Sequence, residues 1–236
     1  MKLFDEMING MQAIIFPETC LNCGCIIPEK ENFLCDGCAA NSFEDANLNN
    51  ADFCDTDLIY PDGIALHDAM WHYDKKGVLQ KMVRMLKYER MERVGLELGR
   101  ILGRRINKRH KGKRFQKPDE VLLVPVPLHI SKKRKRGYNQ AFLIARGIQE
   151  ATGIDIVTEP AIRRNRKTIT QTKLAFGDRM SNLRGVFEVH NPEELQGKLL
   201  LIVDDVFTTG STAFSLHYAI RESIDCKTGI ITIAKA

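Results

Sequence analysis

The most informative stretch of this sequence is Leu199-Leu-Leu-Ile-Val-Asp-Asp-Val-Phe-Thr-Thr-Gly-Ser-Thr212. Its first five residues are apolar, which is typical of a parallel strand buried on both faces. Two consecutive carboxylates follow, Asp204 and Asp205, and a Thr/Ser/Gly cluster then leads directly into a helical run from Ala213. A strand, a polar bend and a helix in this order indicate an α/β fold, in which ligands bind beyond the carboxyl ends of the strands.

The bend after this strand is suited to a sugar phosphate. A glycine lets the backbone approach a ligand closely, and the free amides of the next helix point at the same place. Carboxylates repel phosphate, so Asp204 and Asp205 need other partners, and ribose hydroxyls donate hydrogen bonds to carboxylates. A plain capped helix after a strand explains the Thr/Ser cluster but not the paired acids, and the lysine of a Walker P-loop is missing. The residues predicted to hold the phosphate are Thr208, Thr209, Gly210, Ser211 and Thr212.

Short apolar runs alternate with helical patterns over the second half of the chain, as in a largely parallel sheet. An amphipathic helix or helix pair is expected over residues 78–106, and a short helix over residues 3–16. The further strands and helices are expected at Val121–Val126, Tyr138–Thr152, Ile154–Val157, Val186–Val189, Ala213–Glu222 and Gly229–Ala234.

Charge divides the chain into two units. Residues 1–60 carry two basic and eleven acidic side chains, a net charge of −9, and residues 61–236 carry 33 basic and 19 acidic ones, a net charge of +14. We therefore expect a small N-terminal domain over 1–60 and a larger, anion-attracting domain over 61–236. The composition is near the globular average and no apolar run reaches the roughly 18 residues of a membrane span. With no secretory signal visible, a cytoplasmic protein without membrane insertion is expected.

Two CxxC pairs in the acidic unit have the spacing of a zinc site. Cys20 and Cys23 form the first pair, and Cys35 and Cys38 the second. Four thiolates from two such turns satisfy tetrahedral zinc and leave no open position for catalysis, so the metal would be structural. A redox pair and unligated thiols are the alternatives.

Two other cysteines of this unit lack such a pattern. Cys25 is an alternative ligand, but it breaks the CxxC spacing. Cys54 has no CxxC partner, and it is interpreted as a surface thiol or, with nearby acids, a weak metal ligand.

Cationic clusters dominate the larger unit. The loop after the expected strand Val121–Val126 is stiffened by Pro125 and Pro127, and a basic run over 132–136 follows. This run either contacts pyrophosphate or is a solvated loop or nucleic-acid patch. Asn139 and Gln140 either line the same pocket or cap the next helix. Further clusters lie over 104–117, as a solvated loop or a phosphate-binding surface, and at Arg163, Arg164, Arg166 and Lys167, as part of a cover that excludes water from the site.

The run from Leu199 to Thr212 resembles the 5-phosphoribosyl-1-pyrophosphate (PRPP) binding motif of type I phosphoribosyltransferases. The stretches Val124-Pro-Val-Pro-Leu-His129, Arg136-Gly-Tyr-Asn-Gln-Ala141 and Gln171-Thr-Lys-Leu174, together with the Cys-rich head, resemble the ComF/GntX family over essentially the whole chain. Many members of that family carry a second CxxC pair, which this sequence lacks.

The resemblance implies a type I phosphoribosyltransferase fold with a small N-terminal zinc-ribbon domain of four cysteine ligands. It implies that Asp204 and Asp205 hold the ribose hydroxyls and that magnesium accompanies the pyrophosphate. Lys135 and Arg136 are our choices for the pyrophosphate contacts, because preorganised cations stabilise an anionic leaving group. The implied PRPP-binding residues are Asp204, Asp205, Thr208, Thr209, Gly210, Ser211, Thr212, Pro127, Arg136, Asn139 and Gln140.

Two functions of different classes follow. The first is Mg²⁺-dependent phosphoribosyl transfer from PRPP to an unidentified acceptor, with release of pyrophosphate. The second, implied by the resemblance to ComF, is a binding component for single-stranded DNA uptake in natural transformation, acting with competence proteins and with PRPP as a regulatory ligand. The +14 charge of the larger unit favours the second, although aromatic residues for base stacking are sparse near its cationic clusters.

Overall fold

The structure is a computed structural model that describes residues 19–27, 33–46, 52–55, 57–74, 76–89, 91–109, 120–158, 161–165 and 185–236. The helix expected over 3–16 lies outside these residues, as do Arg166, Lys167 and the end of the basic run over 104–117. Among the helices that are described, none has the length and apolar character needed to cross a membrane.

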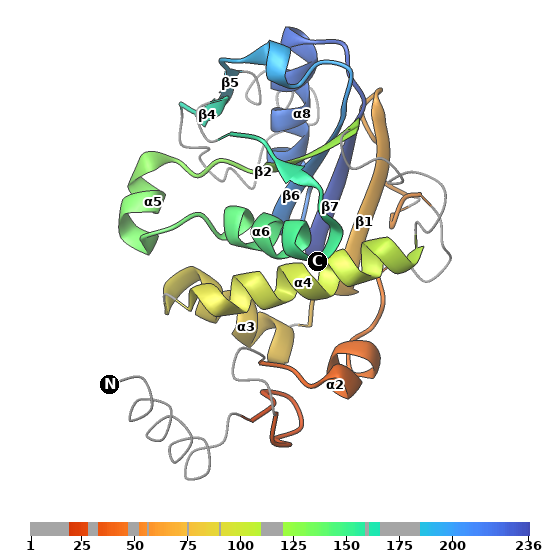
Figure 1. Ribbon diagram of the computed structural model, residues 1–236, viewed down its shortest axis with the longest axis vertical. Coiled ribbons are helices and arrows are strands. Elements are labelled where there is room, and N and C mark those ends of the chain that lie inside the picture. The colour runs from red at the N-terminus through yellow and green to blue at the C-terminus, as the bar shows by residue number, and fades with distance from the viewer. Residues whose placement is uncertain are drawn as a thin grey trace.

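A five-stranded parallel sheet forms the centre of the molecule (Figure 1), which confirms the expected α/β fold. The strand order is β1-β7-β6-β2-β3. All the pairs are parallel. The strands are β1 Ile64–His72, β2 Val121–Pro125, β3 Asp155–Ile156, β6 Leu199–Phe207 and β7 Thr228–Lys235.

Two strands, one in this sheet and one outside it, differ from the expectation. β1 was not anticipated, because His67, Asp68 and His72 interrupt its apolar pattern, yet most of the strand is buried. The residues of Val186–Val189 do not join the main sheet. Instead β5 (Phe187–Val189) pairs antiparallel with β4 (Ile162–Arg164) in a separate two-stranded sheet.

Helices cover both faces of the sheet. The expected helix pair is α3 (Val78–Tyr88) and α4 (Glu92–Arg109), which share one apolar core with α6 (Gln140–Thr152). The second core lies under α8 (Ser211–Ser223) and the β4–β5 pair. A 3₁₀ turn, η2, occupies Pro192–Glu194.

Helices α4 and α6 cross at two glycines. A Cβ on Gly99 would lie 2.1 Å from the carbonyl oxygen of Ile144, and one on Gly147 would lie 2.1 Å from that of Leu96. Only glycine at both positions permits this backbone approach. The close packing fixes α6, whose first residues lie beside the candidate site.

The basic run over 132–136 is a helix, not the loop that we expected. α5 spans Ile130–Arg136 and none of its residues is buried; Figure 1 shows it extending away from the sheet. The His129 side chain accepts from the Ser131 N–H at its start, and Gly137 ends it in a left-handed conformation with φ of 89°. Both caps satisfy backbone groups, so helix formation is favoured despite five consecutive cations.

The Cys-rich head packs against α3 and α4. Its helix α2 spans Asp36–Asn41, and Leu34 belongs to the same apolar core as these two helices. Glu97 of α4 is buried, and its carboxylate accepts hydrogen bonds from the backbone N–H groups of Phe33 and Leu34. The head is therefore attached to the body by both apolar and polar contacts.

Candidate functional site

The carboxyl ends of β2 and β6 lie side by side. Pro125 of β2 is in register with Val203 of β6, and the Val126 N–H continues the pairing by donating to the Val203 carbonyl at 2.9 Å. The next residue of β6 is Asp204. The loop that follows β2 and the acid pair that follows Val203 therefore share one edge of the sheet, where ligands of parallel α/β folds bind.

The two carboxylates have different environments. Alternation along β6 directs Val203 and Asp205 to the face covered by α3. Asp205 is only 6% exposed, and its Oδ2 lies 2.6 Å from Nζ of Lys87, near the end of α3. Asp204 is half-buried, and its Oδ1 accepts from the Asp205 N–H.

The carboxyl group of Asp204 keeps its proton to a higher pH than an ordinary aspartate does. Burial and the neighbouring charge of Asp205 raise the pKa of Asp204 to about 7, although Lys87 and Arg164 oppose this rise. Lys87 forms its ion pair with Asp205, so its charge only partly offsets the effect of burial on the pKa of Asp204. Near neutral pH this carboxyl group can thus either donate or accept a hydrogen bond.

The bend before α8 presents backbone amides that no side chain caps. Gly210 is the N-cap of α8 with φ of 74°, and no side-chain hydrogen bond caps the helix. A Cβ at Gly210 would lie 2.6 Å from the Phe214 ring. Thr208, Thr209 and Ser211 are exposed around it. Free amides at the start of a helix of this length, ringed by hydroxyls, form a fitting anion site.

The end of α3 is held against the start of α6 and against α5. Tyr138 donates from its hydroxyl to the Leu86 carbonyl at 2.6 Å, and the Arg136 guanidinium lies 5.8 Å from the centre of the Tyr88 ring. Lys135 is exposed and Arg136 is half-buried. Lys135 and Arg136, the residues predicted to contact pyrophosphate, therefore lie on α5, which touches α3, the helix that carries Lys87.

Asn139 has the capping role that was one of its two expected roles. Its Oδ1 accepts from the Ala141 N–H and its Nδ2 donates to the Val126 carbonyl, so the side chain ties α6 to the loop after β2. Gln140 is buried, and its Oε1 has no hydrogen-bond partner in the described part of the chain. Pro127 is half-buried in the same loop.

Lys87 and Arg164 are site residues that no pattern in the sequence connects with the acids. Lys87 lies far from them in the chain, within an amphipathic helix whose lysines are otherwise typical of a wet face. Arg164 was assigned only to a cluster covering the site. The pairing of a lysine with Asp205 has no local sequence signal, because it depends on how α3 packs on the sheet.

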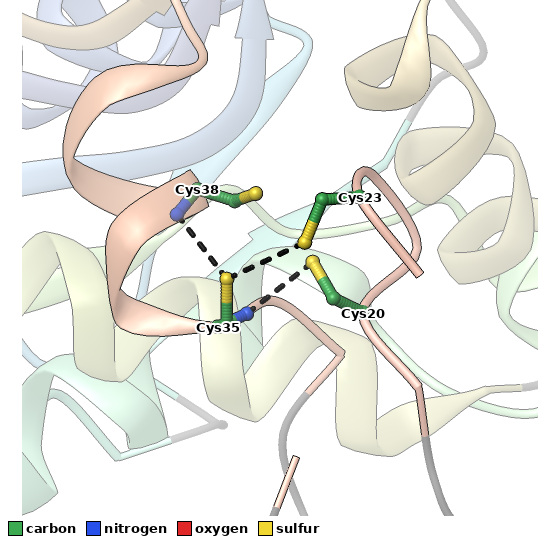
Figure 2. Close-up of side chains that lie close together, drawn as sticks. All are labelled: Cys20, Cys23, Cys35 and Cys38. Atoms are coloured by element: carbon green, nitrogen blue, oxygen red, sulfur yellow. Dashed lines mark hydrogen bonds between the residues drawn. The ribbon is translucent and has the colours of Figure 1, made fainter. Parts of the chain in front are cut away.

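Four cysteines of the head form a cluster that can hold a metal ion. Sγ atoms of Cys20, Cys23, Cys35 and Cys38 all lie within 4.8 Å of one another, and Figure 2 shows their side chains turned toward each other. The Cys23 and Cys35 sulfurs are 3.8 Å apart, which is about the edge of a tetrahedron with Zn–S bonds of about 2.3 Å.

Hydrogen bonds to sulfur accompany this cluster. The Cys35 N–H donates to the Cys20 sulfur, the Cys38 N–H to the Cys35 sulfur, and the Asn22 amide to the Cys38 sulfur, each at 3.4 Å. Burial raises the pKa of the Cys20 thiol, but backbone hydrogen bonds from Cys23 and Cys35 bring it down to about 6. Donors of this kind stabilise thiolates and orient them toward a metal.

The remaining two cysteines of the head stay outside that cluster. Cys25 is exposed, and among the described residues it is not part of the metal-ligand group. Cys54 is half-buried with its sulfur 3.1 Å from Nδ1 of His67, and burial raises the pKa of its thiol to about 11. Cys54 is therefore not the plain surface thiol that was one of its two expected roles, because its sulfur is hydrogen-bonded to a buried histidine.

Relatives of this chain were found among curated proteins, although no family model matches it. It is 33% identical over 134 residues to "DNA utilization protein YhgH" of Escherichia coli, and the match covers 57% of each chain. It is 27% identical over 145 residues to "Competence protein F" of Haemophilus influenzae, covering 61% of this chain and 62% of the relative. It is 32% identical over 105 residues to "Competence protein ComFC" of Bacillus subtilis, covering 44% and 39%. The chain thus matches less than two thirds of the length of these relatives.

Proposed function

We propose that this chain, which belongs to the ComF family, binds PRPP at the carboxyl ends of β2 and β6 and transfers its phosphoribosyl group to a nitrogen acceptor. The observation that carries the proposal is the joint placement of a carboxylate pair and an uncapped helix start at the edge of the sheet, between Asp204 and Thr212. Acids suit the ribose hydroxyls, and amides suit the 5-phosphate.

Each part of PRPP has a matching group. The hydroxyls of ribose donate to Asp204 and Asp205, and the 5-phosphate accepts from the amides and hydroxyls over 208–212. Lys135 and Arg136 stabilise the charge that develops on the leaving pyrophosphate. Magnesium, if bound with the pyrophosphate, supplies Lewis-acid assistance, and the half-buried carboxylate of Asp204 is an oxygen donor of the kind that it prefers.

The reaction itself exchanges one bond for another. The lone pair of the acceptor nitrogen forms a bond to C1 of the ribose, and the bond from C1 to the pyrophosphate oxygen breaks with its electron pair leaving on pyrophosphate. An N–H acceptor then loses its proton to water. Lys87 holds the Asp205 carboxylate in place by its ion pair, so the chain provides a fixed acceptor for a ribose hydroxyl before substrate arrives.

Calorimetric titration of the full chain with PRPP and Mg²⁺ tests this proposal. We expect Asp204→Asn and Asp205→Asn each to weaken PRPP binding by about a hundredfold, because hydrogen bonds to charged groups contribute roughly 1.5–3 kcal/mol each. Asp57→Asn, at an exposed acid in the head, is the matched control and should bind as the unaltered chain does. Equal PRPP affinity in all four proteins would exclude the proposed site.

A second function, the handling of single-stranded DNA, is favoured by α5 and by the names of the relatives, a DNA utilization protein and two competence proteins. Every residue from Lys132 to Arg136 is a cation, and the first four of them are exposed. A solvated cationic helix fits a phosphate backbone. Its ligand would be the strand's phosphates, with PRPP bound separately at the strand ends.

Salt dependence tests the DNA function. With a fluorescent oligothymidylate, we expect affinity to fall steeply between about 50 and about 200 mM salt. Arg134→Gln should reduce the slope of log affinity against log salt by about 0.7, as expected for one phosphate contact on a single strand. Arg146→Gln, at an exposed arginine of α6, should leave the slope unchanged. A flat salt profile would contradict this function.

The cysteine cluster is proposed to hold a structural zinc ion. Its four thiols complete a tetrahedron, so no position remains for a substrate. The metal would then fix the fold of the head, which packs on α3 and α4.

A further inference from the structure

A cavity of about 450 Å³ opens beside the acid pair. Its walls are the loop from Pro125 to Ile130, the first turns of α5 and α6, and the residues around β4. This volume lies within the range of small-molecule sites. Pro127 and Asn139, two of the proposed PRPP contacts, lie at its margin, and the remaining lining residues have no proposed ligand.

The cavity adjoins the proposed ribose site through two of its walls. Pro125 lies in the register position beside Val203, one residue before Asp204. Arg164 lines the cavity, and its positive charge acts on Asp204. A molecule in the cavity would thus lie next to the bound ribose, where an acceptor must be placed.

All the charged side chains that line the cavity are basic. Lys133, Arg163 and Arg164 contribute them, and the lining residues include no aspartate or glutamate. Arg163 is exposed, whereas Arg164 is half-buried over the Phe187 ring, 5.2 Å from its centre. An anionic ligand is therefore favoured, and a ligand that needs a carboxylate partner is not.

His129 adds a hydrogen-bond donor to this lining. A backbone N–H can only donate, so the 3.2 Å contact from the Ser131 N–H requires Nδ1 of His129 to accept. Nε2 is then the ring nitrogen that can donate a hydrogen bond to a ligand. Asn139, which also lines the cavity, caps α6 through its Oδ1 and donates from its Nδ2 to the Val126 carbonyl.

Beside the polar Thr158 and Asn165, much of the wall is formed by apolar side chains, which disfavour pyrophosphate as the ligand. They are Leu128, Ile130, Phe142, Val157 and Ile162. A strongly hydrated polyanion gains nothing from such a wall, whereas a flat organic ring buries apolar surface against it. The ligand must therefore combine a ring with an anionic group.

We propose that this cavity binds the phosphoribosyl acceptor and that the acceptor is a planar heterocyclic or aromatic acid, whose carboxylate is held by Arg163 and Lys133. The inference rests on the proposed function for its reaction, but binding of the acid itself does not require PRPP. The neutral, amide-bearing or amine-bearing analogues of such acids are disfavoured, because they lack the charge that the basic lining selects.

Matched pairs of small molecules test the inference on the full chain. Nicotinate with nicotinamide, and orotate with uracil, differ mainly in the carboxylate. We expect at least one acid to bind about tenfold more tightly than its neutral partner by calorimetric titration, with a dissociation constant below about 1 mM. Arg163→Gln should remove this preference, because it removes one of the two cations proposed to hold the carboxylate. Arg163 is exposed, so its replacement leaves the fold intact. Arg146→Gln, outside the cavity, should keep it.

Parallel titration with PRPP separates the two proposals. If PRPP binds and neither acid exceeds its neutral partner, the acceptor inference is wrong and the PRPP site stands. If an acid binds selectively and PRPP does not, the cavity assignment is supported and the phosphoribosyl function fails. Acid selectivity that survives Arg163→Gln unchanged also overturns the inference.

Discussion

The cysteine cluster and the edge of the sheet that carries Asp204 and Asp205 both bring ionisable side chains together, but from different parts of the chain. All four sulfurs come from one short stretch, Cys20 to Cys38, whose spacing alone places them together. The edge draws Lys87 from α3, Arg164 from β4 and the acids from β6. The cysteine sulfurs accept hydrogen bonds from nearby N–H donors and could hold a metal ion, whereas Asp205 is compensated by a lysine that is remote in sequence. A site of the first kind is encoded locally, and one of the second kind only by packing.

The largest effect is expected at the cluster. Cys38→Ser should abolish binding of one zinc ion per chain and unfold the head, since structural zinc contributes on the order of 10 kcal/mol in small sites. Metal analysis and hydrogen exchange over residues 33–46 measure the two outcomes.

Cys25→Ser is the control within the same segment, because Cys25 lies outside the metal-ligand group. It should retain full zinc content and protection from exchange. Zinc retained by Cys38→Ser and lost by Cys25→Ser would assign the ligands differently.

An intermediate effect is expected at the ion pair of the edge. Lys87→Met leaves the buried Asp205 carboxylate without its partner and should lower the free energy of unfolding by about 2 kcal/mol, less than for a fully buried pair because Lys87 is 24% exposed. Asp205→Asn should partly rescue that loss in the double variant. Urea unfolding of the four proteins measures the coupling, and strictly additive losses would show that the pair is not coupled.

The smallest effect is a pH dependence of PRPP binding. With the pKa of Asp204 near 7, its carboxylate becomes available between about pH 6 and pH 8, so PRPP affinity should rise by about tenfold over this range. Asp204→Asn should keep only the change due to titration of PRPP itself. Titrations at several pH values would contradict the assignment if both proteins changed alike.

The titration of Asp204 has the opposite effect on folding stability: stability falls as the pH rises, whereas PRPP affinity rises. The folded-state pKa of Asp204 is raised above the ordinary value of about 3.9. The folded chain therefore holds this proton more tightly than the unfolded chain does, and ionisation of Asp204 reduces stability as the pH rises from about 4 to about 7. Above this window the contribution is constant.

Prediction from the sequence succeeded where short-range patterns control structure. The all-apolar run from Leu199 and the amphipathic pattern over 78–106 identified β6 and the α3–α4 pair. It failed at β1, whose polar residues are accommodated by tertiary contacts, such as the ion pairs of Asp68 with Arg105 and Arg109. It also failed at α5, where capping outweighs the repulsion of like charges.

By itself, the sequence determined the α/β order, the four clustered thiols and the bend after β6, because hydrophobic period, CxxC spacing and a single glycine act over a few residues. Only the tertiary structure decided that Lys87 pairs with Asp205, that Arg164 lies near Asp204, and that a basic, apolar-walled cavity lies beside them. Charge interactions depend on distance in space and on burial, and neither is written in the spacing of residues along the chain.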